Sequence, residues 1–224
     1  LLDELVKALG NPIASQLSGN DYAEYRASML KAKANPKTLN NRLGYLRSVY
    51  NVLHQLGEID YENPLIRVRP LRLQERELTY LSTAQIGILF DTIEQRCKTP
   101  HVAMISLICL ATGARWGEAQ ALTPERVRDG FVMFVNTKGK RARAIPIDRQ
   151  LEKRIHEHFC KHGGFSNCIN SFDKTLAASK LPVPPGQSSH VLRHTFASHF
   201  IMNGGNILTL QKILGHTSLA MTMR

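Results

Sequence analysis

The spacing of the apolar residues constrains the fold of this chain most, because it follows a helical period almost everywhere and a strand period in one place. After Gly130 the sequence reads FVMFVNT, then KGKR, then ARAIPI, which is typical of a β-hairpin with a short basic turn. This is the only clear sheet signal. Elsewhere apolar residues recur every three or four positions. The sequence therefore predicts a mainly α-helical fold with a small antiparallel β-sheet.

Capping signals place one long helix in the first half of the chain. Asn35 and Pro36 suit an N-cap and a first helical position, and Gly57 suits the end. The apolar residues between them repeat at helical spacing: Leu39, Leu43, Leu46, Tyr50 and Leu53. The other face is polar or basic: Lys37, Asn40, Asn41, Arg42 and Arg47. That face suits either a DNA backbone or bulk solvent.

Residues 62–80 contain two prolines, several arginines and little periodicity, which predicts a linker between two domains. Beyond it, Ser82 and Gln85 form a capping box for a new helix. We expect further helices over the apolar run 102–111, over 148–161 and 171–180, and from an N-cap at Asn206 to about Gly215.

The charge balance points to a polyanionic partner. Lys and Arg number 29 against 18 Asp and Glu, a net charge of +11 with a pI of about 9.8. Nucleic acid is the first candidate. An anionic membrane is a weaker second candidate, because the sequence shows no basic amphipathic anchor. No apolar stretch approaches the roughly 18 residues of a membrane span.

The cysteines and histidines favour no disulfide framework and no metal site. Four cysteines without a CxxC pair, and the lack of a secretory signal, indicate a reduced, intracellular protein. His158 and His162 lie one helical turn apart and suit a shared metal, but the other half of a zinc site is missing. A solvated basic helix face is the preferred interpretation of His156, His158, Cys160 and His162.

Four small groups of basic residues in the second half lie at element ends or tight turns. They are Arg115 in ATGARWGEAQAL, with Glu118 one turn later; Lys138 at the hairpin tip; His190 and Arg193 in HVLR; and His216 in LGH. Each group alone has an ordinary structural explanation: an ion pair between Arg115 and Glu118, a solvated turn lysine, or a helix C-cap. Their order and spacing as a set indicate a site.

That order resembles the active site of the tyrosine recombinases of the phage integrase family. The stretch ATGARWGEAQAL is similar to the family's first-arginine motif, TKGKRARAIPI to its lysine hairpin, and the run from HVLRHTF to LGHTSLAMT to its HxxR-to-LGH segment. The resemblance implies a catalytic domain over 82–224, a helical core-binding domain over 1–70, carried more loosely by NPKTLNNRLGYLRSVYNVL, and a linker over 71–81. Temperate-bacteriophage integrases are the most similar relatives.

The resemblance implies that Arg115 and Arg193 bind the non-bridging oxygens of a scissile phosphate, because guanidinium groups match phosphate with two hydrogen bonds and stay charged. It implies that His190 and His216 add hydrogen bonds and help to move a proton. Glu118 would orient Arg115. Because the arginines supply the positive charge, we expect no metal and no cofactor.

The same resemblance implies that Lys138 protonates the 5′-oxygen leaving group, with Lys140 as a near rival. The nucleophile would be a tyrosine that forms a 3′-phosphotyrosyl link, which stores the bond energy without ATP. It is expected shortly after His216, and the sequence ends at Arg224. The tyrosines present all precede the catalytic half: Tyr22, Tyr25, Tyr45, Tyr50, Tyr61 and Tyr80. We expect a chain truncated before its nucleophile, which binds DNA without cleaving it; an inactive relative is the alternative.

The resemblance also implies the partners. They are double-stranded DNA at attachment sites, a homotetramer in the synaptic complex with this fragment itself monomeric, and accessory DNA-bending proteins, in the cytoplasm of a host bacterium and away from membranes. The reaction would integrate or excise phage DNA. Two alternatives are a plain DNA-binding module that uses only its basic charge, and a type IB topoisomerase, which would relax supercoils without joining two sites.

Overall fold

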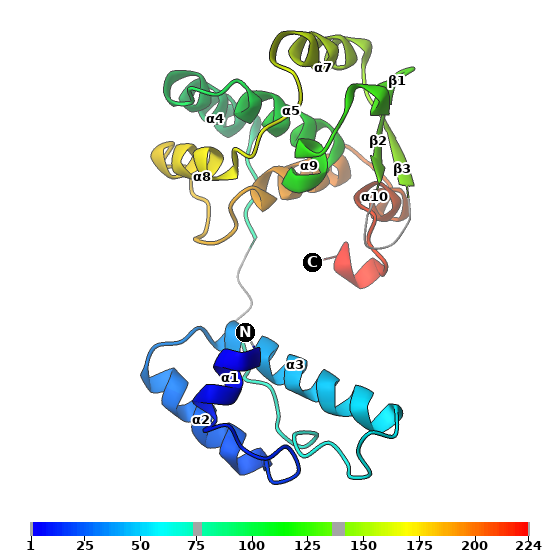
Figure 1. The fold of residues 1–224 in the computed structure, drawn as a ribbon. Coiled ribbons are helices and arrows are strands. Elements are labelled where there is room, and N and C mark those ends of the chain that lie inside the picture. Colours follow the sequence, from blue (N-terminus) through cyan, green and yellow to red (C-terminus); the bar gives the residue numbers. More distant parts are fainter. Residues whose placement is uncertain (1, 74–77, 136–141, 224) are drawn as a thin grey trace. The chain divides into compact units, whose positions relative to one another are not determined.

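The computed structural model describes residues 2–73, 78–135 and 142–223, and these form two compact units, Leu1–Glu75 and Arg76–Arg224. Figure 1 shows the order of the elements. The first unit contains three helices among its described residues: α1 (Leu2–Ala8), α2 (Gly19–Lys31) and α3 (Pro36–Gln55).

The first unit is built around α3, whose predicted start and end are confirmed. The Asn35 side chain accepts a hydrogen bond from the Lys37 N–H, and Gly57 adopts a left-handed φ of 74° just after the helix. Tyr22 of α2 is fully buried and donates its hydroxyl to the Leu39 carbonyl at 2.9 Å. The core of this unit contains Leu5, Leu17, Tyr22, Tyr25, Leu39, Leu43, Leu46, Tyr50, Leu65 and Val68.

Residues 62–72 fold back along α3, so the prediction of a linker over 62–80 was wrong for this part. Leu65 and Val68 are buried in the core of the unit. Arg47 donates to the carbonyls of Leu65 at 2.9 Å, Ile66 at 2.8 Å and Val68. The Asn40 amide pairs with both backbone groups of Leu71, at 2.8 and 2.9 Å. Polar side chains of α3 thus order a segment that has no periodicity of its own.

The opposite end of the predicted linker belongs to the second unit. The Thr79 N–H donates to Gln187 Oε1 at 3.1 Å, and the Leu81 N–H donates to Thr195 Oγ1 at 2.9 Å. Both acceptors lie more than a hundred residues further along the chain, so the sequence held no local sign of them. Both ends of the predicted linker segment are therefore hydrogen-bonded to a folded unit, at Leu71 to the first and at Thr79 to the second.

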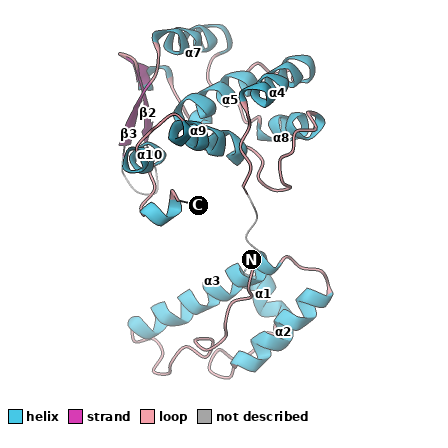
Figure 2. Ribbon diagram, turned by 180° about the vertical axis from the view of Figure 1, so that it is seen from behind, coloured by secondary structure: helices cyan, strands magenta, loops and turns pink. Residues whose placement is uncertain are grey.

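The second unit is mainly helical with one small sheet (Figures 1 and 2). Its helices are α4 (Thr83–Arg96), α5 (His101–Thr112), α6 (Trp116–Gln120), α7 (Arg149–His162), α8 (Ile169–Ala178), α9 (His190–Met202) and α10 (Ile207–Leu214), with 3₁₀ turns at Pro124–Arg126 and Leu219–Met221. The strands are β1 (Val127–Arg128), β2 (Phe131–Val135) and β3 (Ala142–Pro146), antiparallel in the order β1-β2-β3. The predicted fold class is confirmed.

The predicted hairpin is confirmed in the described residues, where Val135 pairs with Ala142 and Phe131 with Pro146. The predicted helix starts are also confirmed at the capping box of Ser82 and Gln85 and at the N-cap Asn206. Strand β1 was missed because two residues are too short to show an alternation.

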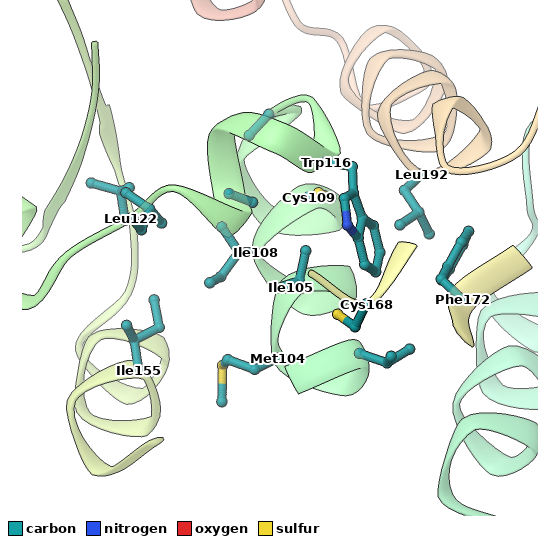
Figure 3. Packing of buried hydrophobic residues seen from close by; sticks show 14 of the residues in the cluster. Met104, Ile105, Ile108, Cys109, Trp116, Leu122, Ile155, Cys168, Phe172 and Leu192 are labelled. Atoms are coloured by element: carbon teal, nitrogen blue, oxygen red, sulfur yellow. The ribbon is translucent and has the colours of Figure 1, made fainter. Parts of the chain in front are cut away.

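Helix α5 lies at the centre of this unit (Figure 3). This central position explains why the helix is apolar on all its faces and why its sequence is a continuous apolar run. Its Ile105, Ile108 and Cys109 are fully buried. Around them lie side chains from α6, α7, α8 and α9, and the Trp116 ring packs on Phe172 with their centroids 4.7 Å apart. The core therefore fixes where α5 ends and where α6 and α9 begin.

His158 does not lie on a solvated helix face, so that interpretation was wrong. It is buried, and its Nε2 lies 2.8 Å from Nδ1 of His101 at the start of α5. The Phe165 ring lies 5.1 Å from the His158 ring. Within the described ranges no group of three or more His, Cys, Asp or Glu side chains is arranged to hold a metal ion. In the same ranges no helix is long and apolar enough to cross a membrane.

Candidate active site

Arg193 is the centre of the site, because its buried guanidinium joins two helix ends. It lies in the first turn of α9 and is only 6% exposed. Nη1 donates to the Gly113 carbonyl at 2.8 Å, and Nη2 donates to the Leu214 carbonyl at 2.7 Å. Carbonyls at a helix C-terminus lack helical partners and carry partial negative charge. Arg193 thus satisfies the ends of both α5 and α10.

Both helices end in a left-handed glycine, which brings their last carbonyls to Arg193. Gly113 has a φ of 66° and Gly215 a φ of 67°. A Cβ at Gly113 would lie 2.5 Å from Cδ1 of Phe196, on the next turn of α9 from Arg193. The close approach of α9 to the end of α5 therefore requires glycine at this position.

His216 follows the Gly215 turn and contacts Arg193 directly. Its Nε2 lies 2.9 Å from Arg193 Nη2, and its Nδ1 lies 3.0 Å from the Thr222 hydroxyl. Burial, and next to it the charges of the Arg193 and Arg115 guanidinium groups, together lower the pKa of His216 to about 4. His216 is therefore a neutral imidazole at physiological pH.

Glu118 is the hub of the second group of site residues. Its Oε2 accepts from the Arg115 backbone N–H at 2.8 Å, and its Oε1 accepts from Arg115 Nη1 at 3.1 Å. Arg143 donates to the same two oxygens, at 2.6 and 3.1 Å. Burial would raise the pKa of this carboxyl, but the hydrogen bonds and charges of Arg143 and Arg115 outweigh it and lower the pKa to about 2.

The electrostatics of the site favour an anion. The pKa of Arg193 is lowered to about 10 because burial and the charges of Arg115 and Arg143 together outweigh the opposing charge of Glu118. Among the described charged groups that act on it, three guanidinium groups including its own face one carboxylate, which leaves two positive charges. Gly113, Leu214 and His216 occupy three of the five guanidinium N–H groups of Arg193, and among the described residues the other two have no hydrogen-bond acceptor, so they are available to a bound anion.

His190, which the sequence predicts as a site residue together with Arg193, is the first residue of α9 and is exposed. Although the residue as a whole is exposed, partial desolvation of its ring lowers its pKa, and the charges of Arg193 and Arg115 act in the same direction. Lys138 and its rival Lys140 lie in 136–141, outside the described residues. Strands β2 and β3 flank that segment.

The structure thus brings Arg115, Glu118, Arg193 and His216 together, with His190 on the same helix end. It adds Arg143, which the sequence analysis missed. Arg143 shares the inward face of β3 with the buried Ile145, two positions on. A charged residue at an inward position of a strand was the available signal.

Comparison with known proteins decides what this arrangement belongs to. Residues 79–224 match the family described as "Phage integrase family", and residues 1–72 match "Phage integrase, N-terminal domain". The chain belongs to the phage integrase family. It is 42% identical to the integrase of Escherichia phage 186 over 228 residues, which cover 97% of this chain and 67% of that protein.

Solved structures of integrases share the fold. The catalytic domain of bacteriophage HP1 integrase is 43% identical, with a TM-score of 0.59 over 66% of this chain and 86% of that one. The integrase of transposon Tn1549 in complex with transposon right-end DNA is 18% identical, with a TM-score of 0.77 over 99% and 86% of the two chains. The chain spans between 64% and 68% of the length of the phage integrases that it matches among curated proteins.

Proposed function

We propose that this chain binds duplex DNA and that the full-length gene product cleaves and rejoins it as a tyrosine-type site-specific recombinase, to integrate or excise phage DNA. The observation that supports this proposal is the cluster of Arg193, Arg115 and Arg143 around a single carboxylate, Glu118. Among the described charged groups that act on Arg193, this cluster has an excess of two positive charges. A phosphodiester is an anion whose charge grows in the transition state of transfer, so such a site stabilises the transition state more than the ground state.

Within this proposal Arg115 and Arg193 bind the non-bridging phosphate oxygens. Arg115 is the more open of the two, with 39% of its side chain exposed, and Glu118 holds both its backbone N–H and its Nη1. Arg193 is held by helix carbonyls on one side, and this fixes its two remaining N–H groups. Donors preorganised in this way contribute without reorganising during the reaction.

Proton transfer falls to the groups at the edge of the site. His190 is exposed and its pKa is lowered, so it is neutral near pH 7 and suited to accept the proton of an attacking hydroxyl. Lys138 is proposed as the donor to the 5′-oxygen, with Lys140 as its rival. We assign to His216 the role of holding Arg193 and not that of transferring the nucleophile's proton, because Arg193 already donates to its Nε2.

The nucleophile is proposed to be a tyrosine that is not among the 224 residues. Five of the six tyrosines belong to the first unit, where the hydroxyls of Tyr22 and Tyr50 bond to backbone carbonyls. The ring of Tyr80 packs against that of His199, with their centroids 6.2 Å apart. His199 lies on the last turn of α9, away from the predicted site residues at the start of this helix.

We also propose that the helical first unit is a core-binding domain that contacts DNA. The synaptic complex is proposed to be a tetramer, with accessory DNA-bending proteins and a cytoplasmic location.

The experiment traps the covalent intermediate with the full-length gene product. Sheared genomic DNA of the organism that encodes the chain is incubated with the protein, and the DNA that remains attached after denaturation is sequenced. A duplex with the recovered sequence, nicked near the crossover, then serves as a suicide substrate. We expect a covalent protein–DNA band that maps to a phosphotyrosine, with a rate loss of about 100-fold or more in Arg193→Ala.

The matched control is Arg96→Ala, an exposed arginine in the last turn of α4. It removes the same charge elsewhere in the same unit and should leave the band unchanged. Tight DNA binding without any band would favour a DNA-binding module, and relaxation of supercoils without joining of two sites would favour a topoisomerase.

A further inference from the structure

We propose that Arg143 is a positioning residue, which holds Glu118 so that Arg115 points at the phosphate and which couples the β2–β3 hairpin to the site. The proposal rests on the proposed function. Arg143 comes from β3, whereas Arg115 and Glu118 come from the start of α6. The contact therefore joins two segments that are otherwise separate.

The two arginines divide both carboxylate oxygens of Glu118 between them. Oε1 accepts from Nη1 of Arg115 and from Nη1 of Arg143, each at 3.1 Å. Oε2 accepts from the Arg115 backbone N–H at 2.8 Å and from Arg143 Nη2 at 2.6 Å. Two parallel bonds from one guanidinium fix the plane of the carboxylate. Rotation of that plane would break the bond to the Arg115 side chain, so Arg143 controls where Arg115 points.

The surroundings of Arg143 indicate that it orients Glu118 as well as stabilising the folded chain. Its side chain is 12% exposed and that of Glu118 is 16% exposed. Arg143 Nε is buried with no hydrogen-bond partner in the part of the chain that the structure describes. Its guanidinium carbon lies 5.1 Å from the centre of the Phe134 ring. Desolvation and the unsatisfied N–H offset part of the attraction in this buried ion pair, so fixed geometry is a larger share of what Arg143 provides.

Arg143 also lies against the turn that carries His216. A Cβ at Gly215 would lie 3.3 Å from Arg143 Nη1, so the guanidinium touches the backbone just before His216. The positive charge of Arg143 contributes to the lowered pKa of both His216 and Arg193. One side chain therefore contacts β3, the α6 start and the Gly215 turn. Of these segments, the α6 start carries Arg115, and the Gly215 turn leads directly into His216.

The test measures single-turnover cleavage of the nicked duplex at saturating DNA by the full-length protein, together with the DNA dissociation constant and the thermal unfolding midpoint. Arg143→Lys keeps the charge but cannot donate to both oxygens in one plane. We expect the cleavage rate to fall by about 10- to 100-fold, the range for residues that orient a functional group, with DNA affinity changed by less than about twofold. A loss in rate without a loss in binding is a split that a merely structural role would not produce.

A double-mutant cycle tests whether Arg143 acts through Glu118. If it does, Arg143→Lys combined with Glu118→Gln should be no slower than the slower single variant, because both remove one interaction. The stability control is Ile145→Val, a buried residue two positions after Arg143 on the same strand. It should lower the unfolding midpoint and leave the saturated rate unchanged.

Three results would overturn the proposal. The first is a wild-type cleavage rate in Arg143→Lys, and the second is a double variant whose rate loss is the product of the losses in Arg143→Lys and Glu118→Gln. The third is a rate loss in Ile145→Val equal to that of Arg143→Lys when both variants have the same unfolding midpoint. A wild-type protein that forms no covalent adduct would overturn the proposed function itself, and this inference with it. An active wild type with an unimpaired Arg143→Lys variant would overturn this inference alone.

Discussion

Arg193 Nη2 and His216 Nε2 lie 2.9 Å apart, and this contact determines the tautomer of the histidine. An arginine side chain has only donors, so Nε2 must be the acceptor and the ring proton must sit on Nδ1. Nδ1 lies 3.0 Å from the Thr222 hydroxyl, whose oxygen accepts a hydrogen bond from the Nδ1–H. His216 is therefore an acceptor that holds Arg193, and a hydrogen bond from its Nε2 to a phosphate would require this contact to break.

The first prediction concerns the charge of His216. Because burial and the charges of Arg193 and Arg115 lower its pKa to about 4, the ring should stay neutral with its proton on Nδ1 throughout the range above pH 5. A two-dimensional ¹H–¹⁵N spectrum of the imidazoles would measure both the tautomer and the pKa, with His216→Gln used to assign the signal. A titration near pH 6.5, or a proton on Nε2, would contradict the arrangement of Arg193 and His216.

The second prediction concerns Glu118 and acid stability. Its folded pKa of about 2 lies below its ordinary value of 4.5, so the unfolded chain binds the proton more tightly. The stabilisation is complete above about pH 4.5 and is lost as the pH falls toward 2. Glu118→Gln should lower the free energy of unfolding near pH 6 by on the order of 2–3 kcal/mol, and by progressively less in acid. Urea unfolding at several pH values measures this, and a difference independent of pH would contradict it.

The third prediction concerns the buried pair of His101 and His158. Burial lowers the pKa of His158 to about 4, below the ordinary 6.5, and His101 shifts in the same direction. Stability from this pair is complete above about pH 6.5 and declines as the pH falls toward 4, because the unfolded chain takes up protons first. His158→Gln should flatten the dependence of the unfolding free energy on pH between 6.5 and 4. Arg154→Gln, an exposed residue on the same helix whose side chain stays charged throughout this pH range, serves as the control and should keep the wild-type slope.

The fourth prediction concerns the glycine between α5 and Arg115. Gly113→Ala should destabilise the protein by about 2–4 kcal/mol, because the backbone is left-handed and the new Cβ would lie 2.5 Å from Phe196. Gly117→Ala offers a matched control within α6, since a Cβ there meets nothing within 4 Å. It should be neutral or slightly stabilising. Equal unfolding free energies for the two variants would show that α9 does not press on Gly113 as described.

The sequence predicted features whose cause is local. The helix starts at Asn35, Ser82 and Asn206 depend on side chains that cap N–H groups two or three residues away. The hairpin from 131 to 146 depends on alternation along two neighbouring strands. The contact between Arg115 and Glu118, three residues apart, also follows from helical geometry.

The predictions that failed depended on distant partners. Residues 62–72 lack periodicity. Their backbone carbonyl and N–H groups are instead held by hydrogen bonds to the side chains of Arg47 and Asn40 on α3. His158 is buried because His101, 57 residues earlier, lies against it. A local pattern contains no record of such contacts.

By itself, therefore, the sequence determined the helical periods, the caps, the single hairpin and the set of Arg115, Glu118, His190, Arg193 and His216. Their resemblance to a known family supplied the expected chemistry. Only the tertiary structure decided that Arg193 bonds to two helix ends and to His216, and that Arg143 shares Glu118 with Arg115. The physical reason is that hydrogen bonds between segments depend on packing around α5. That packing is a property of the whole core and not of any one stretch of residues.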